Sequence, residues 1–341
     1  MMVLTLMVSA CSRDEVTVSE EESTPDETGQ GEPISKTEFM LDTFCTVTVF
    51  SQEDERYIDE ALAICAGYEK LFSRTIDSSE ISKINMAKGE AVEVSAETIF
   101  VLETAIDYAK KSAGAFDISI GAVSALWAFD SENPNASLPL QVDIDKYLPT
   151  VDYKGIELLG GSVRLKNPDT KLDFGGIAKG YIADKMADYL IEKEVSGAII
   201  DLGGNVVTVG SKASGEPWNV GVKNPFPDEG EGFNSVIGAI KIDGRKSIGT
   251  SGVYERYLTC EGERYHHILD PQTGFPVVTD LVGITVVTDM SIDGEGVTTT
   301  CILLGSEKAK AFLEKDGIQA VLVKNDGTII TTASVEFSVI S

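Results

Sequence analysis

Residues 172–181 read LDFGGIAKGY, and the predicted secondary structure changes on either side of this stretch. Its first residues predict the end of a strand, and a helical pattern of apolar residues follows Gly180. Before the stretch, residues 37–50 predict a strand, and two amphipathic helices are expected over residues 52–73 and 95–114.

After the stretch, the chain is dominated by β-branched and alternating segments. Strands are expected at 197–210, 236–243, 254–260, 281–288, 318–324 and 328–340, with helices near 293–304 and 306–316. Because helices and strands come in runs rather than in strict alternation, we expect an α+β fold with a strand-rich C-terminal half.

The glycines of residues 172–181 suggest a ligand site. Unpaired backbone groups at Gly175 and Gly176 can approach a ligand closely at the start of a helix, and Lys179 adds a positive charge. A simple turn with a surface lysine is the alternative interpretation. A second glycine pair occurs in DLGGN, residues 201–205, within a β run, where glycine marks a bulge or a close backbone approach.

Two further motifs follow, SIGTSG at 247–252 and HILDPQTG at 267–274. One predicted strand separates them, as in a hairpin. The second motif ends in a Pro-x-Thr-Gly turn, and an ordinary β-turn would explain it. Since the only two histidines of the chain are His266 and His267, we favour a functional interpretation.

Glu295 and Thr299 lie four residues apart on a predicted helix, so their side chains share one face. Two oxygen ligands without histidine or cysteine favour a hard cation, Mg²⁺ before Zn²⁺. Asp293 is the rival carboxylate, but its offset of six from Thr299 fits a shared helical face less well. An ordinary helix start with threonines is the alternative.

The composition excludes several classes of protein. The chain of 341 residues has 28 Lys plus Arg against 55 Asp plus Glu, a formal charge of −27. Nonspecific nucleic-acid binding is not expected, because it depends on Lys and Arg that neutralise phosphates. The sequence also contains no GxGxxG after a strand, no P-loop, no HExxH and no GxSxG, which argues against the corresponding enzyme classes.

The N-terminal region differs from the rest of the chain. Residues 1–11, MMVLTLMVSAC, are apolar and end in small residues before Cys11, which resembles the lipobox of bacterial lipoproteins, although a basic segment is missing. Residues 12–36 carry a net charge of −6 and no aromatic residue, and predict a disordered acidic tether. Residues 37–341 are expected to form the folded domain.

Taken in order, the motifs resemble the ApbE family of FAD:protein FMN transferases over the body of the chain from residue 37 onward. The matching stretches are LDT (41–43), SEISKIN (79–85), FDISIGAVSALWAF (116–129), LDFGGIAKGY (172–181), DLGGN (201–205), GTSG (249–252), HILDPQTG (267–274) and TTTCILLG (298–305). The resemblance implies a T-fold-related mixed sheet with packed helices.

The resemblance also implies a function. A member of this family binds FAD with Mg²⁺ and transfers the FMN half to a Thr or Ser hydroxyl of a partner protein, releasing AMP. The implied partner carries a motif like D-x-x-[ST]-G-A-[ST] and is a subunit of a membrane redox complex or a flavin-carrying reductase. The enzyme would lie outside the cytoplasm, anchored to the cell membrane through a lipid on Cys11.

By family position, the metal would be held by the Gly176 carbonyl and the side chains of Glu295 and Thr299. The residues implied to contact FAD are Leu41, Asp117, Ile118, Ser119, Asp173, Lys179, His267 and Ile268. Two departures are visible: the family usually has Asp in place of Glu295, and Met-Gly-Thr in place of residues 41–43.

The residue that takes the proton of the attacking hydroxyl stays open at this point. His267 is one candidate, since an unperturbed histidine side chain has a pKa of about 6.5. Asp270 is another candidate, and the third possibility is that the metal alone lowers the barrier enough. Two other functions remain alternatives, an FAD pyrophosphatase that releases FMN and AMP, and a flavin-binding lipoprotein without turnover.

Overall fold

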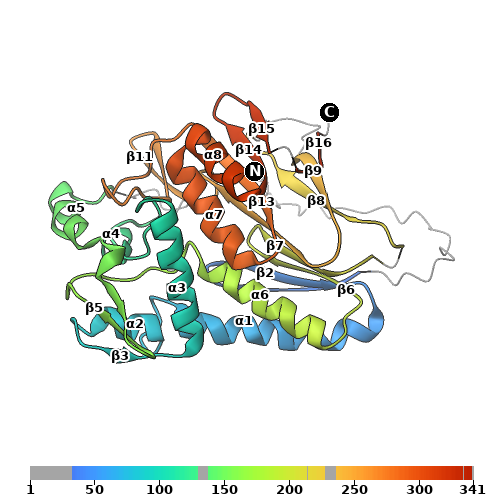
Figure 1. Ribbon diagram of the computed structural model, residues 1–341, viewed down its shortest axis with the longest axis horizontal. Coiled ribbons are helices and arrows are strands. Elements are labelled where there is room, and N and C mark those ends of the chain that lie inside the picture. The colour runs from blue at the N-terminus through green and yellow to red at the C-terminus, as the bar shows by residue number, and fades with distance from the viewer. Residues whose placement is uncertain (1–32, 130–136, 213, 227–235, 333, 340–341) are drawn as a thin grey trace, which may run out of the picture.

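The computed structural model describes residues 33–129, 137–212, 214–226, 236–332 and 334–339. Its centre is an eight-stranded sheet (Figure 1). In spatial order the strands are β1 (Ile34–Met40), β2 (Thr43–Val49), β6 (Gly197–Leu202), β7 (Asn205–Gly210), β10 (Lys246–Gly252), β13 (Leu281–Thr288), β14 (Gln319–Lys324) and β15 (Ile329–Thr331). These strands pair antiparallel throughout, rather than in mixed directions.

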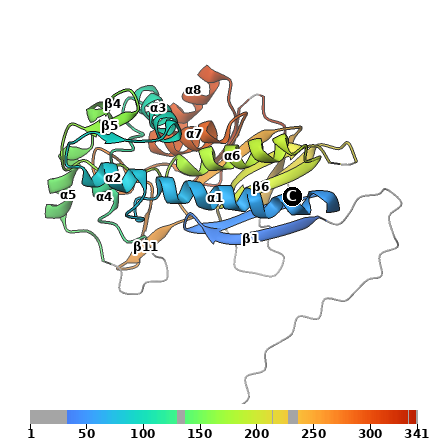
Figure 2. The same cartoon turned by 90° about the horizontal axis from the view of Figure 1, so that it is seen from below.

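Four helices cover one face of this sheet (Figures 1 and 2). They are α1 (Ile58–Phe72), α6 (Ala178–Glu192), α7 (Ser291–Leu304) and α8 (Ser306–Asp316). The opposite face packs against a small sheet made of β8 (Trp218–Lys223), β9 (Val236–Ile242) and β16 (Phe337–Val339). Strand periodicity explains both layers: Val286 belongs to the helix-side core, and its neighbour Val287 belongs to the core under the small sheet.

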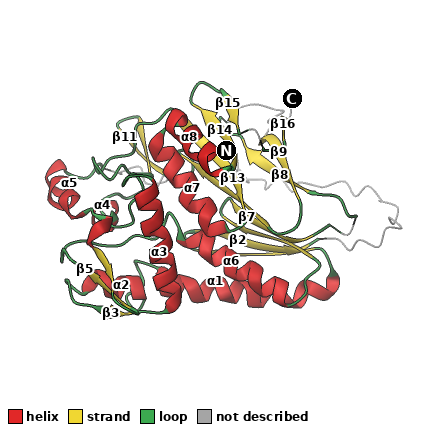
Figure 3. Ribbon diagram, in the orientation of Figure 1, coloured by secondary structure: helices red, strands yellow, loops and turns green. Residues whose placement is uncertain are grey.

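A helical lobe lies beside the sheet, at the left in Figure 3. It contains α2 (Glu80–Met86), α3 (Ala96–Lys111), α4 (Gly121–Ser124), α5 (Gln141–Tyr147) and a small sheet of β3 (Val92–Glu93), β5 (Ser162–Leu165) and β4 (Ile156–Leu158). The hairpin β11 (Tyr257–Cys260) and β12 (Glu263–His266) packs on this lobe through Leu258. Short 3-10 helices complete the chain: η1 (Gln52–Tyr57), η2 (Leu148–Thr150) and η3 (Tyr153–Gly155).

The expected α+β fold with a strand-rich C-terminal half is confirmed, and several boundaries are corrected. The predicted strand 37–50 is a hairpin of β1 and β2, and β1 begins at Ile34, inside the range given to the tether. The predicted strand 197–210 turns at Gly203 and Gly204, whose positive φ of 67° and 91° suits a tight hairpin. The predicted strand 328–340 is likewise divided, into β15 and β16.

The hairpin expected between the motifs 247–252 and 267–274 is also wrong. Residues 247–252 are themselves part of strand β10, and two strands, β11 and β12, follow before His267. The lipidation site predicted at Cys11 and the segment 1–11 lie outside the described residues. Within the part of the chain that the structure describes, no helix has the length and apolar character needed to cross a bilayer.

The crossing of α6 and α7 fixes the geometry on which the site depends. A Cβ at Gly180 would lie 2.4 Å from the Ser291 carbonyl oxygen, so glycine is required for this close approach. Asp184 of α6 caps α7, because Ser291 N–H and Ile292 N–H donate to its two carboxylate oxygens at 2.8 and 3.0 Å. Arg245 pairs with the same carboxylate at 3.0 Å. The N-terminal end of α7 is therefore tied to the first half of α6.

Candidate functional site

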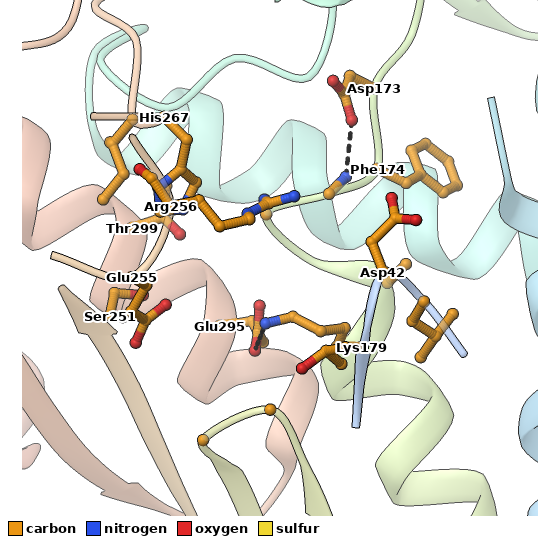
Figure 4. A pocket seen from close by; sticks show the side chains of 18 of the residues that line it. Asp42, Asp173, Phe174, Lys179, Ser251, Glu255, Arg256, His267, Glu295 and Thr299 are labelled. Atoms are coloured by element: carbon orange, nitrogen blue, oxygen red, sulfur yellow. Dashed lines mark hydrogen bonds and ion pairs between the residues drawn. The ribbon is translucent and has the colours of Figure 1, made fainter. Parts of the chain in front are cut away.

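A cavity of about 830 Å³ opens where the β1–β2 turn, the starts of α6 and α7 and the loop after β12 meet. Most of the residues expected at the site line it: Leu41, Asp117, Ile118, Asp173, Gly176, Lys179, His267, Ile268, Glu295 and Thr299. Segments from residue 41 to residue 299 thus converge on one cavity (Figure 4). Its volume lies in the upper part of the range of ligand sites.

Two of the expected residues do not line the cavity. The Ser119 side chain is fully buried and its hydroxyl donates to Asp117 Oδ1 at 2.6 Å. Asp270 lies in the turn before Gly274, where its carboxylate accepts from Gln272 N–H at 2.8 Å. Asp270 is close to His267 in the sequence, but the Asp270 side chain is not part of the cavity wall.

The Lys179 ammonium lies 3.3 Å from Glu295 Oε1, and this ion pair sits in the cavity wall. The Glu295 side chain is only 6% exposed and that of Lys179 is 23% exposed, so water screens the pair weakly. Figure 4 shows the lysine directed at the carboxylate, with Glu255 to one side and Asp42 to the other.

The three residues proposed for the metal lie together at this point. A Cβ at Gly176 would be 3.6 Å from Thr299 Oγ1, and Glu295 is one helical turn before Thr299 on α7. Within the described ranges the Thr299 hydroxyl makes no hydrogen bond, so its oxygen is available as a metal ligand. One carboxylate, one hydroxyl and one carbonyl form an all-oxygen set, which fits a hard cation such as Mg²⁺.

Two observations sharpen the assignment of the metal ligands. The rival carboxylate Asp293 accepts a hydrogen bond from the Tyr108 hydroxyl at 2.8 Å and does not line the cavity. Among the residues that the structure describes, no group of three or more His, Cys, Asp or Glu side chains could hold a metal. A cation held by Glu295 would therefore need backbone, hydroxyl and substrate oxygens to complete its ligands.

Asp117 and Asp173 shape the loops on the other side of the cavity. Asp117 accepts from Ser119 N–H at 2.8 Å and from Tyr153 N–H at 2.9 Å, and burial raises its pKa. Asp173 accepts from Gly175 N–H at 2.9 Å and from the Ser124 hydroxyl at 2.6 Å. The Asp173 carboxylate therefore holds Gly175 in place three residues before the start of α6.

His267 is neutral in this cavity. Its Nδ1 lies 3.1 Å from the Arg256 carbonyl oxygen, which can only accept, so the proton is on Nδ1 and Nε2 carries a free lone pair. Burial, and after it the charge of Arg256, lowers the pKa of His267 to about 3. His266 does not share this position, because its Nε2 lies 3.1 Å from the Val277 carbonyl and its ring lies outside the cavity.

The β1–β2 turn at the cavity edge is strained. Leu41 and Asp42 both have φ of 56°, as a type I′ turn requires, although neither residue is glycine. Leu41 N–H donates to Glu69 Oε1 at 2.8 Å, which anchors the turn to α1. Beside it, Phe39 and Phe44 are 66% and 68% exposed and stack edge to face at 5.6 Å.

Sequence reasoning missed several charged residues of the cavity. Glu255 and Arg256, three and four residues after the GTSG motif, line the cavity, as do Arg74, Asp201 and Lys223. Burial raises the pKa of Glu255 to about 7. Glu255 and Arg256 fell within the strand expected at 254–260, so nothing in the sequence marked them as site residues; that strand begins only at Tyr257, and both residues lie in the loop before it.

The fold and the cavity define an α+β protein with a charged, dinucleotide-sized site between a helix pair and a hairpin turn. The sequence profile of the ApbE family matches residues 41–322. Because that match covers most of the chain, this protein belongs to the ApbE family.

Individual relatives agree with this assignment. The FAD:protein FMN transferase of Treponema pallidum is 32% identical over 88% of this chain and 87% of its own length. The FAD:protein FMN transferase of Klebsiella pneumoniae is 37% identical over 81% of this chain and 86% of its own length. The crystal structure of the ApbE protein of Thermotoga maritima superposes with a TM-score of 0.80 at 29% identity, covering 89% of this chain and 98% of that chain.

Proposed function

We propose that this protein is an FAD:protein FMN transferase that uses Mg²⁺, attaches FMN to a Thr or Ser hydroxyl of a target protein and releases AMP. The observation that carries the proposal is the grouping of Lys179, Glu295, Gly176 and Thr299 in one wall of a cavity large enough for a dinucleotide. The names of the relatives support the flavin chemistry.

In this proposal the metal is held by Glu295, Thr299 and the Gly176 carbonyl. When bound, Mg²⁺ supplies electrostatic stabilisation of the pyrophosphate oxygens. Lys179, in the first turn of α6, adds a positive charge in the same wall. These local groups are needed, because the chain as a whole carries a formal charge of −27 and repels an anionic substrate at long range.

The remaining cavity residues orient the substrate and the acceptor. Nε2 of His267 is a bare acceptor at neutral pH and can receive a hydrogen bond from a donor of FAD or of the target. Phe39 and Phe44 present exposed rings at the cavity edge, where an aromatic ring system such as a flavin can stack. Leu41 and Ile268 add apolar surface to the same cavity.

The target and the location belong to the same proposal. We place the enzyme outside the cytoplasm, tethered by residues 12–36 to a lipid on Cys11, where it would meet a membrane redox subunit or a flavin-carrying reductase. The acceptor would carry a D-x-x-[ST]-G-A-[ST]-like motif. Labelling cells with a radioactive fatty acid tests the anchor: label retained by the wild-type protein and lost in Cys11→Ala supports it, and equal labelling of both contradicts it.

The transfer itself is tested with purified protein, FAD, Mg²⁺ and a peptide that carries the motif. The proposal predicts a peptide with the mass of one added FMN, with AMP formed in equal amount. FMN and AMP released at the same rate without the peptide would instead identify a pyrophosphatase. Bound FAD that stays intact at every Mg²⁺ concentration would identify a flavin-binding protein without turnover.

A further inference from the structure

We infer that Glu255 is the catalytic residue that removes the proton of the attacking hydroxyl. This inference rests on the proposed function and names a residue for a step that the metal ligands and Lys179 do not perform. Glu255 lies in the loop between β10 and β11, three residues after Gly252, and its side chain lines the cavity.

The carboxylate of Glu255 is unengaged, unlike most of its neighbours. Within the described part of the chain it forms no hydrogen bond and no ion pair, whereas Asp173 and Asp201 accept backbone N–H groups and Glu295 pairs with Lys179. Among the described residues of the cavity, Asp42 is the other carboxylate without a hydrogen bond or ion pair, but it lies on the strained turn, on the opposite side of the Lys179 and Glu295 pair (Figure 4).

The surroundings of Glu255 leave one side of it open to the cavity. A Cβ at Gly204 would lie 4.0 Å from Glu255 Oε1, so the carboxylate sits over the tight β6–β7 turn rather than against a side chain. Figure 4 shows the Glu255 side chain next to Ser251, with Glu295 between Glu255 and Asp42. An acceptor hydroxyl that enters the cavity from this side meets a carboxylate with both oxygens free.

The charges around Glu255 suit a general base. Burial, the largest cause, and the nearby Glu295 raise the pKa of Glu255, while Lys179, Lys223 and Arg256 lower it, and the balance of these effects places it at about 7. A base whose pKa lies near the working pH combines a large ionised fraction with good proton affinity.

The two residues expected to act as base fit less well. The pKa of His267, lowered to about 3, makes that ring a weak proton acceptor, and its Nδ1 is already engaged with the Arg256 carbonyl. Asp270 does not line the cavity. His267 therefore acts as a hydrogen-bond partner of the substrate, and the proton goes to Glu255.

The acceptor hydroxyl loses its proton to a Glu255 carboxylate oxygen while its oxygen forms a bond to the phosphorus on the FMN side of the pyrophosphate. The bond from that phosphorus to the bridging oxygen breaks, and AMP leaves with the bridging oxygen and its electron pair. Glu255 then gives the proton to solvent, so one FAD and one hydroxyl yield one FMN ester, one AMP and one proton.

The test compares wild type with Glu255→Gln, which keeps the size of the side chain and removes the base. The transfer rate at saturating FAD and Mg²⁺ is measured between pH 5.5 and 8.5 with the motif peptide. We expect the wild-type rate to rise with pH up to about 7 and then level off, and the variant to be about 100-fold slower with no such rise. Glu255→Asp should keep the pH-dependent rise at a reduced rate.

Three controls separate a base from a structural or metal-binding role. Glu263→Gln, an exposed residue of the neighbouring strand β12, should match wild type. The Kd for FAD of Glu255→Gln should stay within about twofold of wild type, which shows that the cavity is intact. A Mg²⁺ activation constant raised by more than about tenfold, with the rate restored at high Mg²⁺, would make Glu255 a metal ligand and overturn the inference.

The outcomes also distinguish the inference from the proposed function. If wild type labels the peptide and Glu255→Gln labels it at the same rate with the same pH profile, the inference alone fails. If wild type forms neither labelled peptide nor AMP, the proposed function fails, and the role of Glu255 fails with it.

Discussion

The ammonium of Lys179 on α6 lies 3.3 Å from the carboxylate of Glu295 on α7, and both line the cavity. The pair joins two helices that come from distant parts of the chain and that pack closely at Gly180. It therefore links the helix crossing, which is a property of the fold, to the electrostatics of the site.

Replacing Lys179 with Met should reduce both FAD affinity and transfer. The change removes the charge that faces Glu295 and leaves this buried carboxylate without its partner. We expect transfer efficiency to fall by about 100-fold, measured as kcat/KM for FAD with the motif peptide. Lys185→Met changes a lysine of the same helix that does not line the cavity, and should behave as wild type. Unchanged kcat/KM in Lys179→Met would remove this residue from the site.

Glu295 should control the dependence on Mg²⁺. Glu295→Gln keeps the shape of the side chain and removes its charge, so we expect the Mg²⁺ concentration for half-maximal rate to rise by about tenfold or more. Glu295→Asp should remain Mg²⁺-dependent, and chelation by EDTA should stop the wild-type reaction. The matched control is Asp293→Asn, whose carboxylate contacts Tyr108 outside the cavity. An equal Mg²⁺ requirement in Glu295→Gln would contradict the assignment.

Asp184 should stabilise the fold by holding the start of α7. Asp184→Asn replaces one accepting oxygen by a donating amide that faces a backbone N–H, and we expect a loss of about 1–3 kcal/mol in the free energy of unfolding by urea. Asp188→Asn, at an exposed position that also contacts Arg245, is the control and should change stability little.

The stability difference between wild type and Asp184→Asn should depend on pH. Burial raises the pKa of Asp184 to about 6, above the value of about 4 expected in the unfolded chain. The folded state therefore binds more protons between these values, and the advantage of wild type should shrink as the pH rises from about 4 to about 6. An advantage that grows over this range would mean that the carboxylate is ionised throughout.

Asp42→Gly should raise the stability of the protein. Asp42 has φ of 56°, a conformation that glycine adopts without steric cost, so we expect a gain of about 1 kcal/mol, measured as a higher Tm. Glu194→Gly is the matched control, because Glu194 has φ of 58° and does not line the cavity. Both variants should gain stability, and only Asp42→Gly should alter the KM for FAD. A lower Tm in Asp42→Gly would show that its side chain stabilises the turn.

The sequence predicted the elements whose patterns are long enough to read. The 15-residue helix α1 and the strands β13 and β14 follow their apolar periodicity closely. The seven-residue helices α2 and α5 were missed, since two turns give too few apolar repeats to recognise. The division of 37–50 into two strands was missed because the turn contains no glycine and Leu41 is not a residue typical of a tight turn.

The site could be predicted where glycine-rich motifs mark it and not elsewhere. Gly176 and Lys179 stand in one motif, and Glu295 and Thr299 share a helical face, so their grouping follows from local spacing. Glu255 follows strand β10, which lies two strands from β6 in the sheet. This strand order brings Glu255 to the cavity, and the spacing of residues along the sequence does not reveal it. The position of Asp270 outside the cavity could likewise not be predicted, because it depends on the β-turn that the Asp270 carboxylate stabilises.

The most direct test of the account is mass spectrometry of the motif peptide after incubation with the purified protein, FAD and Mg²⁺, with AMP measured in the same sample. The account predicts one FMN added per peptide on its Thr or Ser, AMP in equal amount, and neither product with Glu295→Ala. A peptide of unchanged mass, with wild-type protein that has bound FAD, would contradict it.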